Sequence, residues 1–134
     1  GILQLGSNDI YLPPNQETVL EEIFSTSSII NGMNIDAPSG TTALNIFQLF
    51  SHAHQLMTRF DIFILHSTGE EELIYTALDY LHPPILQLDP PLVLTIGQSL
   101  IARATYNNTT DEVVTFGLFS TNEMMLIFGL GYFE

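Results

Sequence analysis

The chain has 134 residues, of which 46% are apolar, so it can bury one hydrophobic core and is not expected to be disordered. There are 15 acidic residues against two basic ones, which gives a formal net charge of -13. This charge excludes nucleic acids and anionic membranes as partners, because an acidic surface is repelled by both.

Short runs of Ile, Leu, Val, Phe and Thr, cut by Pro, Gly and Asn, predict an all-β fold, an antiparallel jelly-roll-like β-sandwich of about eight strands. We expect residues 1–9 to be an extension or linker, or alternatively an added edge strand, and residues 10–134 to form the single sandwich domain. The predicted strands are 10–12, 18–27, 43–54, 60–67, 72–78, 92–106, 113–119 and 124–133.

Proline-rich segments mark the predicted connections. Proline removes a backbone donor and fixes φ, so the strand ladders are expected to stop at residues 13–15, 37–40, 82–84 and 89–91. No apolar run of 18 residues is present, so no membrane span is expected. The start at Gly1, without a signal-like segment, indicates a processed piece of a longer protein.

The tripeptide His52-Ala53-His54 is the first candidate for chemistry. Side chains two apart on a strand point to the same face, so the two imidazoles can reach one metal ion. The alternative is a pair of partly exposed histidines on a polar strand face, and a metal site needs a third ligand.

Met124 can supply that ligand, because two imidazoles and a thioether form a soft site suited to copper in both oxidation states. The alternative is that Met124 fills a gap in the core, which is the common role of methionine at the start of an apolar strand. Spacing alone leaves both interpretations open.

Seven segments, taken in order, resemble the C-terminal domain of the copper type II, ascorbate-dependent monooxygenases, the family of peptidylglycine and dopamine β-type enzymes. In order and spacing they span residues 10–124 of the chain. The segments are 10–14 (IYLPP), 50–56 (FSHAHQL), 81–84 (LHPP), 89–92 (DPPL), 105–110 (TYNNTT), 114–117 (VTFG) and 121–124 (TNEM).

The resemblance implies that His52, His54 and Met124 hold one copper ion, cycling between Cu(I) and Cu(II), at which oxygen is activated and a substrate hydroxylated. In the family, ascorbate donates electrons to a second copper on a companion domain, held by three histidines. His66 and His82 lie in separate segments and do not make such a site, so this chain is expected to be inactive alone.

The resemblance also implies a place outside the cytoplasm: secreted, extracellular or periplasmic. Cysteine is absent from the chain, which by itself leaves the compartment open. Two sequons, at Asn107 and Asn108, lie in a predicted turn and are candidates for glycosylation in a eukaryotic secreted chain. Phe50, Leu126 and Phe128 stand where the peptide-amidating branch has polar groups, which argues against a peptidylglycine substrate.

Two further functions stay open. The first is an extracellular structural subunit that reuses the sandwich in a homopolymer or sheath, because residues 60–65 and 126–133 are apolar on both faces and favour self-association. The second is a copper carrier, which needs the same ligands without oxygen chemistry.

Overall fold

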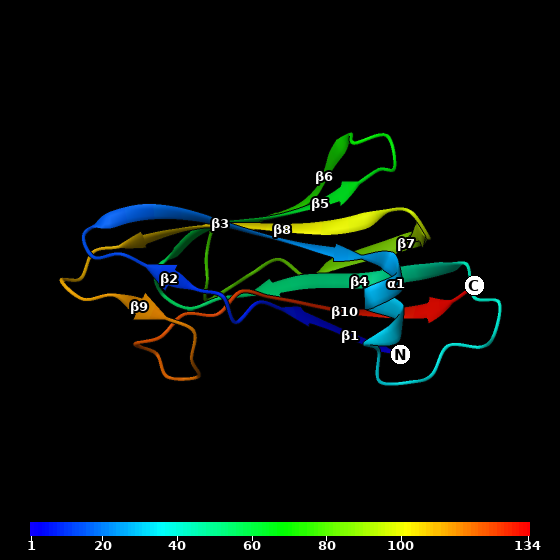
Figure 1. The fold of residues 1–134 in the computed structure, drawn as a ribbon, viewed down its shortest axis with the longest axis horizontal. Helices are drawn as coiled ribbons and strands as arrows, with labels where there is room; N and C mark the ends of the chain where they lie inside the picture. Colours follow the sequence, from blue (N-terminus) through cyan, green and yellow to red (C-terminus); the bar gives the residue numbers. More distant parts are fainter.

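The computed structural model describes residues 1–134, and two antiparallel sheets packed face to face make up most of it (Figure 1). The first sheet has the order β1 (Ile2–Gly6), β10 (Leu126–Phe133), β4 (Ala43–His52) and β7 (Leu86–Thr95). The second sheet has the order β3 (Gln16–Ser25), β8 (Ser99–Asn108), β5 (Met57–Leu65) and β6 (Glu71–Ala77). The short strands β2 (Tyr11–Leu12) and β9 (Val114–Thr115) pair separately. The all-β sandwich is confirmed, with ten strands in place of about eight.

The core lies between the two sheets, because alternate residues of each strand point inward. Leu44 and Ile127 come from the first sheet, and Phe60 and Leu100 from the second; all four are 0% exposed. Each such side chain stabilises the fold by roughly 1.5–3 kcal/mol relative to its exposed state. This core holds β4, and with it the candidate histidines, in place.

The predicted strand at 92–106 is wrong, because the chain reverses inside it. Gly97 has a φ of +100°, a left-handed conformation that glycine adopts at little cost, and it separates β7 from β8. The apolar residues on both sides of Gly97 belong to different sheets. A continuous apolar run therefore concealed a turn.

The predicted stop at residues 89–91 is also wrong, since β7 runs through Pro90 and Pro91. The pairing of β7 with β4 jumps from Leu92, opposite Ile46, to Gln87, opposite Gln48. Residues 88–91 therefore bulge out of the ladder, and the strand then continues. An edge strand tolerates this, because it has a neighbour on one side only.

The first residues of the chain complete the first sheet. All five residues of β1 pair with β10, from Ile2 opposite Leu130 to Gly6 opposite Leu126. The amino group of Gly1 donates a hydrogen bond of 2.6 Å to the carbonyl of Gly131. Residues 1–9 thus contribute an edge strand to the chain's own sheet.

Two other predicted strands end earlier than expected. Residues 18–27 end as a strand at Ser25, whose hydroxyl accepts a hydrogen bond from the Ser28 N–H and caps the helix α1 (Thr26–Asn31). Of residues 113–119, only β9 is extended, and the rest is loop. The structure contains no helix with the length and apolar character that crossing a membrane requires.

The strand β4 positions the candidate site. It runs away from α1 and from both termini and ends at His52, so the site lies at the end of the sandwich opposite the termini (Figure 1). Gly129 of β10 allows β10 to approach β4 there, because a Cβ at Gly129 would lie 2.5 Å from the carbonyl oxygen of Gln48.

Candidate metal centre

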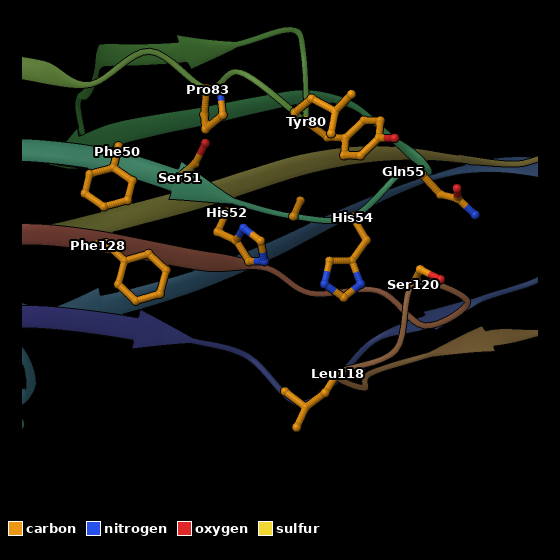
Figure 2. Close-up of a pocket in the computed structure, with 12 residues that line it drawn as sticks. Phe50, Ser51, His52, His54, Gln55, Tyr80, Pro83, Leu118, Ser120 and Phe128 are labelled. Carbon is orange, nitrogen blue, oxygen red and sulfur yellow. The ribbon is translucent and has the colours of Figure 1, made fainter.

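The structure brings the rings of His52 and His54 together where β4 leaves the sheet. Their centroids are 5.4 Å apart and their planes are nearly perpendicular, at 82°. Both rings extend into the same space below the strand (Figure 2). For metal–nitrogen bonds of about 2.0–2.1 Å, two imidazoles that share one ion have centroids on the order of 5 Å apart. The observed spacing fits a shared ion.

A hydrogen bond sets the orientation of the His54 ring. Its Nδ1 lies 2.9 Å from the carbonyl oxygen of Asn122. A carbonyl oxygen can only accept, so Nδ1 carries the proton and donates. The lone pair of the neutral ring is therefore on Nε2, and a hydrogen bond of this kind is how proteins orient a metal-binding imidazole.

The His52 ring makes no hydrogen bond within the chain, so both of its nitrogens are free. Burial, and after it the charge of His54, lower the pKa of His52 below its ordinary value of 6.5. The ring is therefore neutral at neutral pH and has a lone pair to give to a metal.

Met124 lies in the loop just before β10 and is half-buried, whereas the neighbouring Met125 is 2% exposed and fills the core. Met125 is therefore a core residue, whereas Met124 is not part of the buried core. The backbone N–H of Met124 lies 3.3 Å from Oε1 of Glu123, and the same oxygen accepts a hydrogen bond of 2.8 Å from the His54 N–H. One carboxylate oxygen thus links the backbones of Met124 and His54.

Glu123 is the site residue that the sequence did not predict. It is 0% exposed, and besides these two contacts its Oε2 accepts a hydrogen bond of 2.8 Å from the Leu56 N–H. Burial raises the pKa of Glu123 above its ordinary value, while its three hydrogen bonds from backbone N–H groups, and after them the charge of His54, act in the opposite direction. The carboxylate holds the turn after His54 against the loop before Met124.

Tyr106 supports the same loop from the core. Its hydroxyl is buried and donates a hydrogen bond of 2.7 Å to the carbonyl of Met124. Burial, and after it the charge of Glu123, raise the pKa of Tyr106 well above its ordinary value, so the hydroxyl stays protonated and keeps donating. Met124 is therefore fixed by its N–H and its C=O.

A cavity of about 650 Å³ opens beside the two histidines. No Asp, Glu, Lys or Arg lines it, and Met124 is not among its lining residues. Its lining consists of Phe50, Ser51, His52, Ala53, His54, Gln55, Tyr80, Leu81, Pro83, Leu118, Ser120 and Phe128 (Figure 2).

The chain matches one protein family over residues 1–134, the copper type II ascorbate-dependent monooxygenase, C-terminal domain. The chain belongs to this family. The resemblance noted in the sequence is thereby confirmed. No curated protein matches the chain.

Membership in a copper-dependent monooxygenase family makes copper the metal to test against these residues. No three His, Asp or Glu residues are grouped so that they could hold a metal ion. A third ligand beside His52 and His54 must then be of another type, and the chain contains no cysteine. Met124 is the candidate for such a ligand, because a thioether together with two imidazoles makes a set that suits copper.

The two other histidines of the chain contact residues away from this site. His66 contacts Glu72 through Nε2 at 2.9 Å and Gln98 through Nδ1 at 3.2 Å. His82 is largely exposed and lies 3.2 Å from Asp79. Neither lines the cavity beside His52.

The two sequon asparagines have different environments. Asn108 is 0% exposed, and its amide donates hydrogen bonds to the carbonyls of Leu12, Pro13 and Glu112. Asn107 is exposed. In the folded chain, only Asn107 is accessible to a glycan.

Proposed function

We propose that the chain binds one copper ion through the imidazoles of His52 and His54 and the thioether of Met124. The observation that carries the proposal is the pair of rings 5.4 Å apart, one held by Asn122 with Nε2 free and the other neutral and without a hydrogen bond. Such a site stabilises Cu(I) through its soft ligands and still accepts Cu(II).

We further propose that this domain is the oxygen-activating, substrate-hydroxylating half of a monooxygenase. Bound copper would supply the activation of dioxygen, and the overall reaction converts a C–H group, O₂, two electrons and two protons into an alcohol and water. The residues of the chain would orient the ion, exclude water with apolar walls and hold the substrate next to it.

The electrons must come from outside this chain. His66 and His82 are each paired with an acidic side chain, so the chain offers no second set of three histidines. We therefore propose a companion domain with a three-histidine copper site that receives electrons from ascorbate. The family also favours a secreted or lumenal location. The isolated chain is expected to show no turnover with ascorbate and oxygen.

Copper binding by the purified chain tests the proposal. Cu(I) is titrated at neutral pH in the presence of ascorbate with a chelator as competitor. One equivalent is expected to bind, and His52→Ala, His54→Ala and Met124→Leu are each expected to lower the affinity by about tenfold or more. The matched controls His66→Ala and His82→Ala should leave it unchanged. Binding that is indifferent to the first three substitutions contradicts the proposal.

The structural alternative has support from exposed apolar side chains such as Leu118 and Phe119, which are 81% and 77% exposed. β1 already pairs with β10, so it is not a free segment to donate to a neighbour, but its outer side is an unpaired sheet edge that another copy could extend. Light scattering over a range of concentrations distinguishes the two functions, since a chain that stays monomeric is no polymer subunit.

A further inference from the structure

The cavity beside His52 has an aromatic wall. Phe50 and Phe128, opposite each other on β4 and β10, stack with centroids 5.4 Å apart and planes inclined by 24°. The ring of His52 meets Phe128 edge-on at 6.4 Å. A ring that enters from solvent therefore finds aromatic surface directly next to the metal-binding imidazole (Figure 2).

The opposite wall and the mouth are also largely apolar. Tyr80, Leu81 and Pro83 come from the segment after β6, and Leu118 comes from the loop after β9. Leu81 is 64% exposed and Leu118 is 81% exposed. A ligand bound beside these two side chains would remove part of their apolar surface from water, which favours binding.

No Asp, Glu, Lys or Arg side chain lines this cavity. The two arginines of the chain, Arg59 and Arg103, lie on β5 and β8 in the second sheet, and both are paired with carboxylates. An anion would find no arginine or lysine there and would be repelled by the net charge of -13. A cation would find no carboxylate in the lining.

The polar groups that remain are neutral. The Ser51 hydroxyl is already bonded to Tyr75 at 3.1 Å. The side chains of Gln55 and Ser120 line the cavity and make no hydrogen bond within the chain. They can pair with a neutral hydroxyl, carbonyl or N–H group of a ligand.

We propose that this cavity binds an uncharged small molecule with an aromatic ring, stacked against Phe128 and Phe50 and adjacent to His52. The inference rests on the proposed function in one respect, since it makes this molecule the substrate of the copper site. The volume of about 650 Å³ is within the range of small-ligand pockets.

Three probes with the same ring and different charge test the proposal at neutral pH: indole, indole-3-acetate and tryptamine. Binding to the copper-free, isotope-labelled chain is followed by NMR shifts of the cavity residues. Indole is expected to bind, and the anionic and cationic probes at least about tenfold more weakly, because their charge would be buried unpaired. Phe128→Ala, with Phe128→Leu as the milder change, is expected to weaken indole by about fivefold to tenfold.

Phe47→Ala is the matched control, because Phe47 is an aromatic residue of β4 that pairs with Tyr132 and does not line the cavity. It should leave indole binding unchanged. The proposal is overturned if a charged probe binds as tightly as indole, or if indole is indifferent to both Phe128 variants. It is also overturned if the cavity signals shift with protein concentration and not with indole, since a second copy then covers the site.

These results separate this inference from the copper proposal, because the probes are measured without metal. A chain that binds copper and not indole contradicts the inference alone. A chain that binds indole and not copper retains the cavity and contradicts the proposed function.

Discussion

The carboxylate of Glu123 accepts a hydrogen bond of 2.8 Å from the backbone N–H of His54, which is one of the candidate copper ligands. Glu123 precedes Met124, and the other carboxylate oxygen holds Leu56. Two ligand-bearing segments that are far apart in sequence are thus joined by one buried acid. These hydrogen bonds fix the backbone on both sides of the candidate site.

Replacing Glu123 with Gln changes the pH dependence of stability. The pKa of Glu123 is raised by burial, so ionisation costs the folded state more than the unfolded chain, and wild type loses stability as the pH rises from about 4.5 through the folded pKa. Glu123→Gln has no such loss. The difference in melting temperature, wild type minus variant, is therefore expected to fall between pH 4 and pH 7, as measured by thermal unfolding.

Glu123→Gln is also expected to lower stability by an amount that does not depend on pH. The amide NH₂ of Gln cannot accept a hydrogen bond, so one backbone N–H is left unpaired, at a cost of about 1–3 kcal/mol. Glu112→Gln is a suitable control, because Glu112 is exposed. A melting-temperature difference that stays constant with pH for Glu123→Gln would show that its ionisation is not coupled to folding.

Tyr106→Phe tests the support of Met124 from the core. The substitution keeps the ring and removes the hydroxyl that donates to the Met124 carbonyl, which leaves a partly buried acceptor unpaired. We expect a loss of about 1–3 kcal/mol in the free energy of unfolding. Copper affinity should fall as well, because the Met124 backbone is released.

Denaturant titration measures the first effect and chelator competition the second. Tyr132→Phe is a control from the far end of β10, because Tyr132 is half exposed, packs against Phe47 and makes no hydrogen bond through its hydroxyl within the chain. If Tyr106→Phe lowers stability and leaves copper affinity unchanged, Tyr106 has a structural role only.

Local spacing was enough to predict the histidine pair, and no local pattern predicts Glu123. His52 and His54 come together because alternate residues of a strand share a face. The partners of Glu123 are backbone N–H groups 67 to 69 residues earlier in the chain, together with its neighbour, and backbone donors leave no trace in residue identity. The only feature of the sequence that could have pointed to Glu123 is its position as an acidic residue just before an apolar strand.

The errors in the fold have similar causes. Gly97 lies inside a continuous apolar run, so periodicity joined two strands that belong to different sheets. Pro90 and Pro91 usually end a strand, and only the position of β7 at an edge allows the ladder to bulge and resume. The turn at Gly97 and the continuation of β7 through the two prolines both depend on which strands lie next to each other in the fold. The spacing of residues along the sequence does not contain that information.

The adjacent residues Asn107 and Asn108 form a matched pair for stability. Asn108→Ala removes the amide that donates to three carbonyls, and we expect it to cost about 2–3 kcal/mol. Asn107→Ala changes an exposed side chain and should stay within about 0.5 kcal/mol of wild type. Denaturant unfolding of both variants measures this. Equal losses of stability for the two variants would show that the hydrogen bonds of Asn108 to the carbonyls of Leu12, Pro13 and Glu112 do not stabilise the fold.

Arg103 crosses the outer face of the second sheet and ties together its two edge strands. It pairs with Glu21 of β3 and Glu71 of β6, and its guanidinium lies 4.6 Å from the centroid of the Phe63 ring. All three charged groups are partly exposed, so each pair contributes only about 0.2–1 kcal/mol. Arg103→Met keeps an apolar chain over Phe63 and is expected to cost about 1 kcal/mol in total.

Salt separates this electrostatic contribution from packing. Exposed ion pairs are screened when the Debye length falls to about 3 Å at 1 M salt, whereas contact with Phe63 is not. The difference between wild type and Arg103→Met in the free energy of unfolding should therefore shrink as salt is raised from 0.05 M to 1 M. Arg103→Lys should recover less than the full difference, because an ammonium group cannot reach two carboxylates with a planar fork. A difference that persists unchanged at 1 M salt would assign the role of Arg103 to packing against Phe63.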